Sequence, residues 1–283
     1  SEVKELFQTL RAKVTIAAER RALGLPAEGA SSLHMIFEGN PGTGKTTVAR
    51  LMGRLFKAVS ILPKGHLVEV SRVDLVGQHV GETAPKTKNV VDQAVGGVLF
   101  VDEAYTLVSD GKDAFGKEAL ESVMKCMEDM REELVVILAG YPEDMQKLLL
   151  ANPGLKSRFP VTVHFPDYSG AELLEIAQGM LGKMQMSLSD AARGRLQQVC
   201  VAQAQLHDAL SGNARFVRNL IEKASMRQAQ RLVALPVRTK ELLMTLEEED
   251  FGVPPPELLK SGLVLANKTL DILAELARAN SPK

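Results

Sequence analysis

The sequence predicts an α/β domain with a mostly parallel sheet, followed by a smaller all-α domain. Two observations lead to this prediction. Short apolar runs alternate with helical patterns as far as Pro166, and beyond that residue the strand signals stop while helical periodicity continues. Alternation of strands and helices is typical of a parallel sheet that is covered by helices on both faces.

The strands of this sheet are expected at short apolar runs. These runs cover residues 33–38, 67–70, 98–101, 134–139 and 161–165. Helices are expected where apolar residues recur every three or four positions. Such patterns run from Val3 to Val14, from Val48 to Val59 and from Leu120 to Met127.

Apolar residues at helical spacing fill the chain from Leu173 to Ile221. We therefore place a boundary near Asp167, which gives an α/β domain over 1–166 and a helical domain over 167–253. The prolines at 254–256 cannot continue a helix, so they separate a tail at 254–283. Apolar residues in the tail repeat in steps of four and three, which predicts a helix. That helix either packs back on its own chain or binds a partner, because so short a seam is marginal alone in water.

Composition and charge exclude several classes of protein. With 45% hydrophobic residues the chain can bury a sizeable core. Its 34 basic and 35 acidic residues leave a formal net charge of -1, so no overall positive field points to nucleic acid. No apolar run approaches the ~20 residues of a membrane span, and the segment from Ser1 to Leu10 lacks a signal-peptide pattern. We expect a soluble protein of the cytoplasm, or of an organelle stroma or matrix if the chain is a processed piece.

The two cysteines, Cys126 and Cys200, lie far apart in the sequence, without a CxxC pair or a nearby histidine cluster. This pattern predicts neither a disulfide framework nor a zinc site. We expect both thiols to be reduced and buried, because free cysteine is among the most buried residue types.

A glycine-rich loop lies between the first predicted strand and the following helix. The stretch from Gly39 to Thr46 matches the phosphate-binding pattern G-x-x-x-x-G-K-[ST]. Backbone N–H groups of such a loop point at phosphate oxygens, Lys45 reaches the terminal phosphates, and Thr46 offers a hydroxyl to Mg²⁺. A mere tight turn would leave the lysine unexplained. The sequence therefore predicts binding of ATP and Mg²⁺ through Gly39, Asn40, Pro41, Gly42, Thr43, Gly44, Lys45, Thr46 and Thr47.

An acidic pair, Asp102 and Glu103, follows the apolar run 98–101. Carboxylates at the carboxyl end of a strand lie where ligands bind in open α/β sheets. Asp102 is expected to hold hydrated Mg²⁺, and Glu103 to orient and polarise the attacking water. Alone, such a pair is often only a solvated strand end. The phosphate-binding loop upstream makes it a predicted catalytic site.

Four motifs in this order resemble the AAA+ ATPase family over residues 1 to about 250. They are the glycine-rich loop, the acidic pair, the stretch from Asn152 to Phe159 and the stretch from Gly212 to Arg215. Within that family the sequence is most similar to the red-type Rubisco activase branch, which also contains sporulation protein K-like ATPases and type VII secretion chaperone ATPases. The shared sequence segments cover residues 39–50, 75–84, 96–105 and 212–217.

The resemblance implies a fold and a set of roles. The implied fold is a parallel-sheet P-loop NTPase domain followed by a helical lid, and the implied assembly is a homo-oligomeric ring, hexameric by this resemblance. Arg158 resembles the arginine finger, which reaches into the nucleotide site of the neighbouring subunit, where a guanidinium stabilises charge on the transferring phosphoryl group. Arg215 resembles the sensor 2 arginine of the lid. The catalytic residues would then be Glu103, Arg158, Arg215 and Lys45.

The family places the loop that lines the central pore between the second and third strands. His79, Val80 and Gly81 occupy this position, and His79 stands where the family normally has an aromatic residue. A second departure concerns sensor 1, a polar residue at the end of the fourth strand. The chain offers Ala139, Gly140 and Tyr141 there, of which only Tyr141 is polar.

The resemblance implies remodelling of a client protein, and Rubisco is the most specific hypothesis. That hypothesis rests on the similarity of the segment 78–88, which includes residues Thr83 to Thr87. The alternatives are a nucleotide-gated oligomeric scaffold and a secretion- or sporulation-type chaperone ATPase. Glu103 and Arg158 argue against a purely binding module, since neither is needed to hold nucleotide. A DNA-acting protein is disfavoured by the balanced charge.

Overall fold

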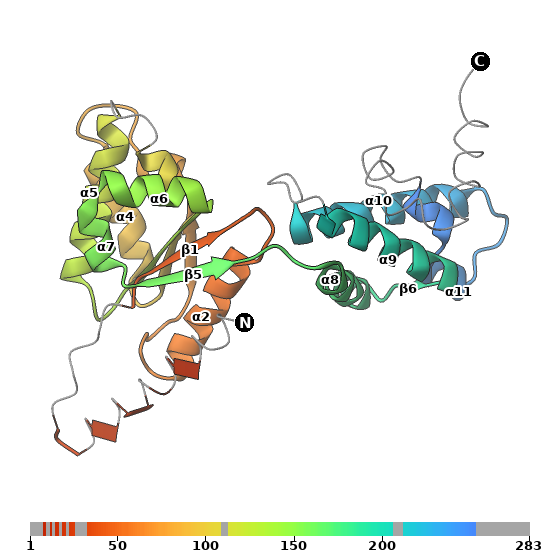
Figure 1. Cartoon of the computed structure of the whole chain (residues 1–283), viewed down its shortest axis with the longest axis horizontal. Coiled ribbons are helices and arrows are strands. Elements are labelled where there is room, and N and C mark those ends of the chain that lie inside the picture. Colours follow the sequence, from red (N-terminus) through yellow and green to blue (C-terminus); the bar gives the residue numbers. More distant parts are fainter. Residues whose placement is uncertain are drawn as a thin grey trace. The chain divides into compact units, whose positions relative to one another are not determined.

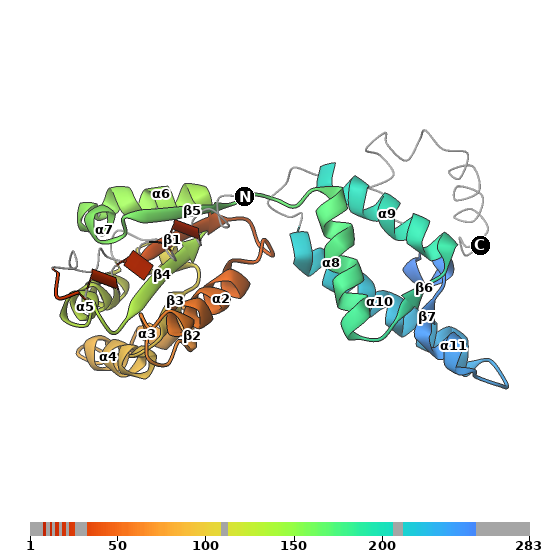
Figure 2. The same ribbon diagram turned by 90° about the horizontal axis from the view of Figure 1, so that it is seen from below.

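The computed structural model of the chain describes residues 33–108, 113–205 and 212–252, together with isolated positions between 8 and 25. The chain divides into two compact units. The first runs through Asn40 and then from Gly44 to Pro166, whereas the second contains Pro41–Thr43 and the chain from Asp167 onward. Both are drawn in Figures 1 and 2.

The first unit is built on a five-stranded sheet with the order β2-β3-β4-β1-β5. All neighbouring strands are parallel. The strands are β1 (Met35–Gly39), β2 (Leu67–Val70), β3 (Val98–Val101), β4 (Val135–Gly140) and β5 (Val161–Phe165). Every residue of β3 and β4 is buried, which explains why these strands are continuous apolar runs in the sequence rather than alternating ones. The predicted parallel sheet is confirmed.

Helices cover both faces of this sheet. They are α2 (Lys45–Ala58), α3 (Arg72–Leu75), α4 (Thr83–Ala94), η1 (Ala104–Leu107), α5 (Ala114–Asp129), α6 (Pro142–Ala151) and α7 (Pro153–Arg158). One apolar cluster joins α2 to the sheet through Met35, Phe37, Met52, Phe56 and Phe100. The other joins α4, α5 and α7 to the sheet through Ile36, Val91, Leu99, Leu120 and Leu155.

Apolar periodicity did not predict α4, and the physical reason lies in its buried face. That face consists of Thr83, Thr87, Val91 and Ala94, so its first two turns are polar. Pro85 adds a second misleading signal, although proline is tolerated in a first helical turn, where N–H groups have no intrahelical partner.

The second unit is mainly helical, as the sequence predicts. Its elements are α8 (Gly170–Lys183), β6 (Ser187–Leu188), α9 (Asp190–Gln205), α10 (Asn213–Val233), α11 (Lys240–Met244), β7 (Thr245–Leu246) and η3 (Glu248–Phe251). Leu173, Leu196, Cys200 and Val217 belong to its buried core. The parallel pair of β6 and β7, two residues each, adds a small sheet that strand signals in the sequence did not reveal.

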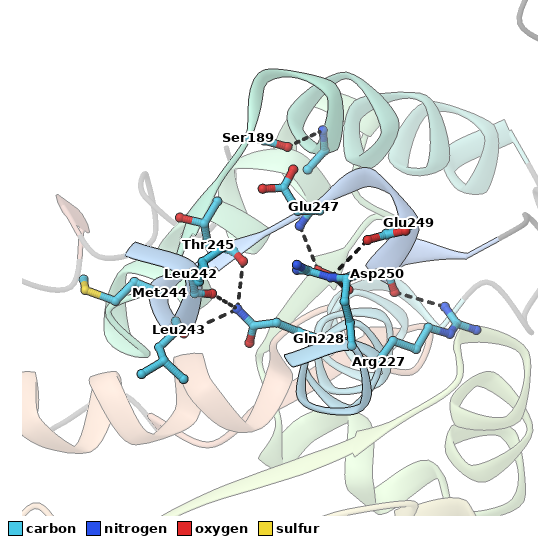
Figure 3. Close-up of polar contacts among 12 residues, drawn as sticks. Ser189, Arg227, Gln228, Leu242, Leu243, Met244, Thr245, Glu247, Glu249 and Asp250 are labelled. Carbon is cyan, nitrogen blue, oxygen red and sulfur yellow. Dashed lines mark hydrogen bonds and ion pairs between the residues drawn. The ribbon is translucent and has the colours of Figure 1, made fainter. Parts of the chain in front are cut away.

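Polar side chains of α10 hold the segment from α11 to η3 in place (Figure 3). The Gln228 side chain donates to the carbonyls of Leu242, Leu243 and Thr245, at 3.2, 3.3 and 2.8 Å. Arg231 donates from two nitrogens to the buried carboxylate of Asp250, at 3.1 and 2.7 Å. A buried carboxylate needs such paired donors, so this contact fixes the end of the unit against α10.

Several expectations remain to be placed. The predicted helix from Val3 to Val14 lies mostly outside the described residues, and the tail helix at 254–283 lies wholly outside them. Cys200 is buried as predicted, but Cys126 is only half-buried, because it flanks the buried stripe of α5. Within the described ranges, no helix is long and apolar enough to cross a membrane.

Candidate nucleotide site

The glycine-rich loop begins where β1 ends at Gly39, and α2 begins at Lys45. Gly42 and Gly44 have φ angles of 75° and 95°, in the left-handed region that favours glycine. Gly44 caps α2 without a side-chain hydrogen bond, and the first turn of α2 has no acidic residue. The N–H groups of that turn lack intrahelical partners, and they carry the positive end of the helix dipole. The loop and helix therefore fit a phosphate group.

Two side chains at the start of α2 have defined contacts. The Lys45 ammonium donates to the carbonyls of Gly39 and Asn40, at 2.6 and 2.9 Å, so it lies across the loop. The Thr46 hydroxyl donates to the Glu69 carboxylate at 3.5 Å. Glu69, on β2, is a neighbour that the motifs did not reveal, and its only signal is a lone acid inside an apolar strand. Thr47 is exposed on α2.

The acidic pair lies at the carboxyl end of β3, the same edge of the parallel sheet at which β1 ends. Asp102 is half-buried, and its backbone N–H donates to the Val70 carbonyl at 2.8 Å. Glu103 is exposed, and its N–H donates to the Asp102 carboxylate at 3.0 Å. The Glu103 carbonyl accepts hydrogen bonds from the N–H and hydroxyl of Thr106, at 2.9 and 2.7 Å.

Glu103 has an uncommon backbone conformation. Its φ and ψ angles are 48° and 44°, in the left-handed region that costs a residue with a side chain roughly 1–2 kcal/mol. The two hydrogen bonds from Thr106 hold this conformation. Backbone strain of this kind is concentrated at functional sites.

The second unit contains the middle of the glycine-rich loop. Ala214 N–H donates to the Gly42 carbonyl at 3.1 Å, and the Tyr168 hydroxyl donates to the Thr43 carbonyl at 2.9 Å. A Cβ atom on Gly42 would collide with the Gly212 carbonyl, which gives this glycine a steric reason beyond its φ angle. Arg215 follows Ala214 on the first turn of α10, with its side chain exposed.

Asn213 is the buried residue at the centre of these contacts. Its side-chain nitrogen donates to the Pro41 carbonyl at 3.2 Å and to the Asp167 carboxylate at 2.7 Å. Its side-chain oxygen accepts from the Tyr168 N–H at 2.9 Å. The sequence motif from Gly212 to Arg215 points to its arginine and does not reveal the roles of Asn213 and Tyr168.

Arg158 ends α7, which is anchored by buried Leu155 and Phe159. Its guanidinium donates to the Gly154 carbonyl at 3.1 Å and lies 3.9 Å from the Glu128 carboxylate. The Arg158 side chain is 40% exposed. A guanidinium on a rigidly packed but accessible helix end is suited to contact with another molecule.

The predicted pore loop lies between α3 and α4. His79, Val80 and Gly81 are all exposed, and Val80 reaches 90% exposure. The Glu82 carboxylate accepts from the N–H groups of His79 and Gln78, both at 3.0 Å, and these bonds lower the pKa of Glu82. The loop therefore lies on the surface and has a fixed base. Its hydrogen bonds described here do not involve the glycine-rich loop.

The run from Thr83 to Thr87 makes contacts inside the chain. The Thr83 hydroxyl accepts from Gly77 N–H at 3.2 Å, and the buried Thr87 hydroxyl donates to the Leu75 carbonyl at 3.0 Å. The Lys86 ammonium donates to the carbonyls of Val73 and Val76, at 2.7 and 2.8 Å. These side chains hold both ends of the predicted pore loop.

The predicted sensor 1 position lies at the end of β4. Ala139 and Gly140 are buried in the strand, and Tyr141 precedes α6. The Tyr141 ring lies 5.8 Å from that of Tyr105, whose pKa is raised to about 12 by burial and by the nearby charge of Glu103. The phenol near the acidic pair is therefore that of Tyr105, and Tyr141 lies against its ring.

The described residues contain no cluster of three or more His, Cys, Asp or Glu that could hold a metal ion. Mg²⁺ in nucleotide enzymes usually takes one or two protein ligands together with phosphate oxygens and water. Thr46 and Asp102, at the same edge of the sheet, have the hard oxygen atoms that such a site requires.

Comparison with known protein families gives two matches that together cover most of the chain. A family profile described as "ATPase family associated with various cellular activities (AAA)" matches residues 35–167. A profile described as "AAA lid domain" matches residues 169–260.

Several curated proteins are similar over most of their length. Stage V sporulation protein K of Bacillus subtilis is 44% identical over 253 residues, which cover 89% of this chain and 78% of that protein. The chloroplastic ribulose bisphosphate carboxylase/oxygenase activase of Cyanidioschyzon merolae is 44% identical, with 88% and 85% covered. Protein CbbX of Cereibacter sphaeroides is 42% identical, with 96% and 87% covered.

Proposed function

Because the chain belongs to the AAA family of ATPases, we propose that it couples ATP hydrolysis in a ring of identical subunits to the remodelling of a client protein. The observation that carries this proposal is the placement of two motifs at one edge of the sheet. The glycine-rich loop follows β1 and the acidic pair follows β3, where open α/β sheets bind ligands.

The glycine-rich loop is proposed to bind the phosphates of ATP. Backbone N–H groups of the loop and of the first turn of α2 would contact phosphate oxygens, and Lys45 would exchange its two carbonyl partners for the terminal phosphates. Mg²⁺, held through Thr46 and Asp102, neutralises phosphate charge when bound. Glu103 would orient the attacking water and accept its proton.

Two arginines are proposed to complete the site. Arg158 would act on nucleotide held by a neighbouring subunit, which suits its accessible place at the end of α7. Arg215 would contact the terminal phosphate as the sensor 2 arginine. The backbone contact of Ala214 with Gly42 supports this role, because it brings the start of α10 to the loop. We assign the large domain to 1–166, the lid to 167–253 and a tail to 254–283.

The client is proposed to be a protein gripped by the exposed loop of His79, Val80 and Gly81. Rubisco is the most specific candidate, because one relative is named a ribulose bisphosphate carboxylase/oxygenase activase. A sporulation-type chaperone ATPase is the alternative, since another relative is named for sporulation. We propose a hexameric ring, and location in the cytoplasm or an organelle stroma or matrix.

The first test is ATP hydrolysis against protein concentration, with subunit mass followed by light scattering. We expect activity per subunit to rise as the ring forms. Glu103→Gln and Arg158→Ala should both lose hydrolysis while Glu103→Gln still assembles with ATP. Arg131→Ala, which removes an exposed arginine in the turn after α5, is the matched control and should keep wild-type activity. Equal hydrolysis by the monomer would overturn the shared site.

The second test distinguishes the Rubisco hypothesis from the sporulation-type alternative. Inactive red-type Rubisco is incubated with the protein and ATP, and recovery of carboxylase activity is measured. Recovery with wild type and none with Glu103→Gln would establish Rubisco as a client. Hydrolysis without recovery would favour the sporulation-type alternative, whose client must then be sought separately.

A further inference from the structure

Arg72 connects two parts of the first unit that are remote in sequence. It is the first residue of α3, directly after β2 and Ser71. Its guanidinium donates to the Thr106 carbonyl at 2.9 Å and forms an ion pair with the Asp113 carboxylate. Sequence motifs did not single out this arginine, because its partners lie more than thirty residues away, as in the separation of 34 from Thr106.

The structure provides a fitted seat for the Arg72 guanidinium. Asp113 caps α5 by accepting from Gly116 N–H at 3.1 Å, and the hydrogen bond from Arg72 is the largest cause of its lowered pKa. A Cβ atom on Gly116 would collide with the Arg72 guanidinium and with the Leu107 carbonyl. A planar guanidinium that is held by both Thr106 and Asp113 has a fixed position and orientation.

One end of this connection is the turn that carries Glu103. Thr106, whose carbonyl binds Arg72, donates both its N–H and its hydroxyl to the Glu103 carbonyl, at 2.9 and 2.7 Å. These bonds hold the left-handed conformation of Glu103. A change in that turn would therefore move the Thr106 carbonyl and its arginine partner.

The other end is the pore loop. The Arg72 carbonyl accepts from Val76 N–H at 3.0 Å, which closes the single turn of α3. Lys86 ties the carbonyls of Val73 and Val76 to α4. A short helix that is fixed in this way moves as one piece, and its last residue leads directly into the segment with His79 and Val80.

We infer that Arg72 is a positioning residue that couples the turn of Glu103 to the pore loop. The inference rests on the proposed function, in which the loop moves during the nucleotide cycle. Glu103 shifts when the terminal phosphate is present, the Thr106 carbonyl follows, and Arg72 carries the shift through α3. Coupling between the two sites is tested by measuring movement of the loop.

The chain contains no tryptophan, so one introduced tryptophan would be the only source of indole fluorescence. Val80→Trp places a single indole on the exposed loop of the full chain. Its emission is compared with ADP and with a non-hydrolysable ATP analogue. We expect a nucleotide-dependent difference, which Arg72→Gln should reduce at least threefold. Arg131→Gln, at an exposed arginine of the same unit, should leave the difference unchanged.

A second variant helps to distinguish loss of coupling from misfolding. Asp113→Asn keeps an oxygen that can cap α5 but removes the charge that binds Arg72, so it should reduce the emission difference in the same direction and by less. Melting temperature and affinity for a fluorescent nucleotide show that each variant is folded and loaded. A merely structural role for Arg72 would change melting without changing the nucleotide-dependent difference.

Two outcomes would overturn the inference. In one, Arg72→Gln and Asp113→Asn keep the full emission difference; in the other, the reporter chain shows no difference between nucleotides. ATP hydrolysis of the reporter chain is measured in parallel. If hydrolysis still rises with assembly, only the coupling role of Arg72 fails, whereas loss of that rise would count against the proposed function itself.

Discussion

The glycine-rich loop and the pore loop are held in different ways. In the glycine-rich loop the backbone itself is specialised, with left-handed glycines at positions 42 and 44 and a lysine that bonds to the carbonyls of its own loop. In the pore loop the base is held by side chains of the following helix, namely Thr83, Lys86 and Thr87. The first loop combines its own backbone conformation with contacts from residues distant in sequence, such as Tyr168 and Asn213, whereas the second is held by the helix that follows it.

This difference explains what each loop can do. A loop whose N–H groups are arranged by glycines presents a fixed array of donors, as phosphate binding requires. A loop with an anchored base and an exposed tip keeps its ends in place while Val80, at 90% exposure, remains available for contact. The variants below test whether the two loops are as separate as their contacts indicate.

Lys45→Ala should have the largest effect. Removing the ammonium takes away its charge-assisted bonds to phosphate, and we expect nucleotide affinity to fall roughly 100- to 1000-fold, or about 3–4 kcal/mol. Titration with a fluorescent ATP analogue measures this loss. The pore loop should be untouched, so the amides of Gln78 and His79 should exchange hydrogen at the wild-type rate. Faster exchange there would show that the loops are not independent.

His34 tests the scaffold that carries the glycine-rich loop, because it directly precedes β1. Its ring accepts from Val136 N–H at 3.0 Å, and burial lowers its pKa from 6.5 to about 4. The unfolded chain binds a proton near pH 6.5 while the folded chain stays neutral until about pH 4. The contribution of neutral His34 to the free energy of unfolding is therefore complete above pH 6.5. The free energy of unfolding falls by about 3 kcal/mol as the pH drops to 4.

Urea unfolding at pH 7 and pH 4.5 measures this dependence. His34→Asn keeps a side-chain oxygen that can accept from Val136 but has no titrating ring, so the variant should lose less stability than wild type between the two pH values. Equal losses in both chains would show that the ring of His34 is not responsible.

The glycines of the two loops make a matched pair. Gly42→Ala meets both a positive φ angle and the Gly212 carbonyl, so we expect nucleotide affinity to fall at least tenfold, about 1.4 kcal/mol. Gly81 has a φ angle of +87°, but no heavy atom lies within 4 Å of an added Cβ. Gly81→Ala should leave affinity within about twofold, with only the backbone penalty on stability. A similar loss in both variants would remove the distinction between the loops.

The distinction between local patterns and distant partners marks how far the sequence could predict this structure. The parallel sheet, the glycine-rich loop and the acidic pair follow from local patterns, since a buried strand is an apolar run and a left-handed turn requires glycine. Glu69, Asn213 and Tyr168 were not predicted. Each acts through a partner distant in sequence, such as Pro41 for Asn213, at a separation of 172 residues.

Resemblance to a family predicted roles that local patterns could not. Arg158 and the pore loop are predictions of that kind. The structure shows what holds these residues: the buried anchors of α7 for Arg158, and contacts with α4 for the loop. Helix α4 itself was hidden, because its buried face begins with the threonines at positions 83 and 87. A polar residue that is buried for its hydrogen bond breaks the apolar periodicity from which helices are predicted.

Thr87→Val should have the smallest effect and bears most directly on the pore loop. The hydroxyl of Thr87 is buried and donates to the Leu75 carbonyl at 3.0 Å. Valine has nearly the same shape but leaves that carbonyl without its donor, which costs about 1–2 kcal/mol. Part of this cost should fall on the loop base, so amide hydrogen exchange at Gln78 and His79 should accelerate while that of β3 does not.

The control is Thr162→Val, at an exposed position of β5, where both side chains are β-branched and the change should stay within about 0.5 kcal/mol. Unfolding midpoints and ATP affinity complete the comparison. If Thr87→Val weakened ATP binding as much as it loosened the loop, the hydroxyl would belong to the connection between the loop and the nucleotide site. Unchanged affinity with a looser loop would confine Thr87 to anchoring, and would leave Arg72 as the residue through which α3 senses the turn of Glu103.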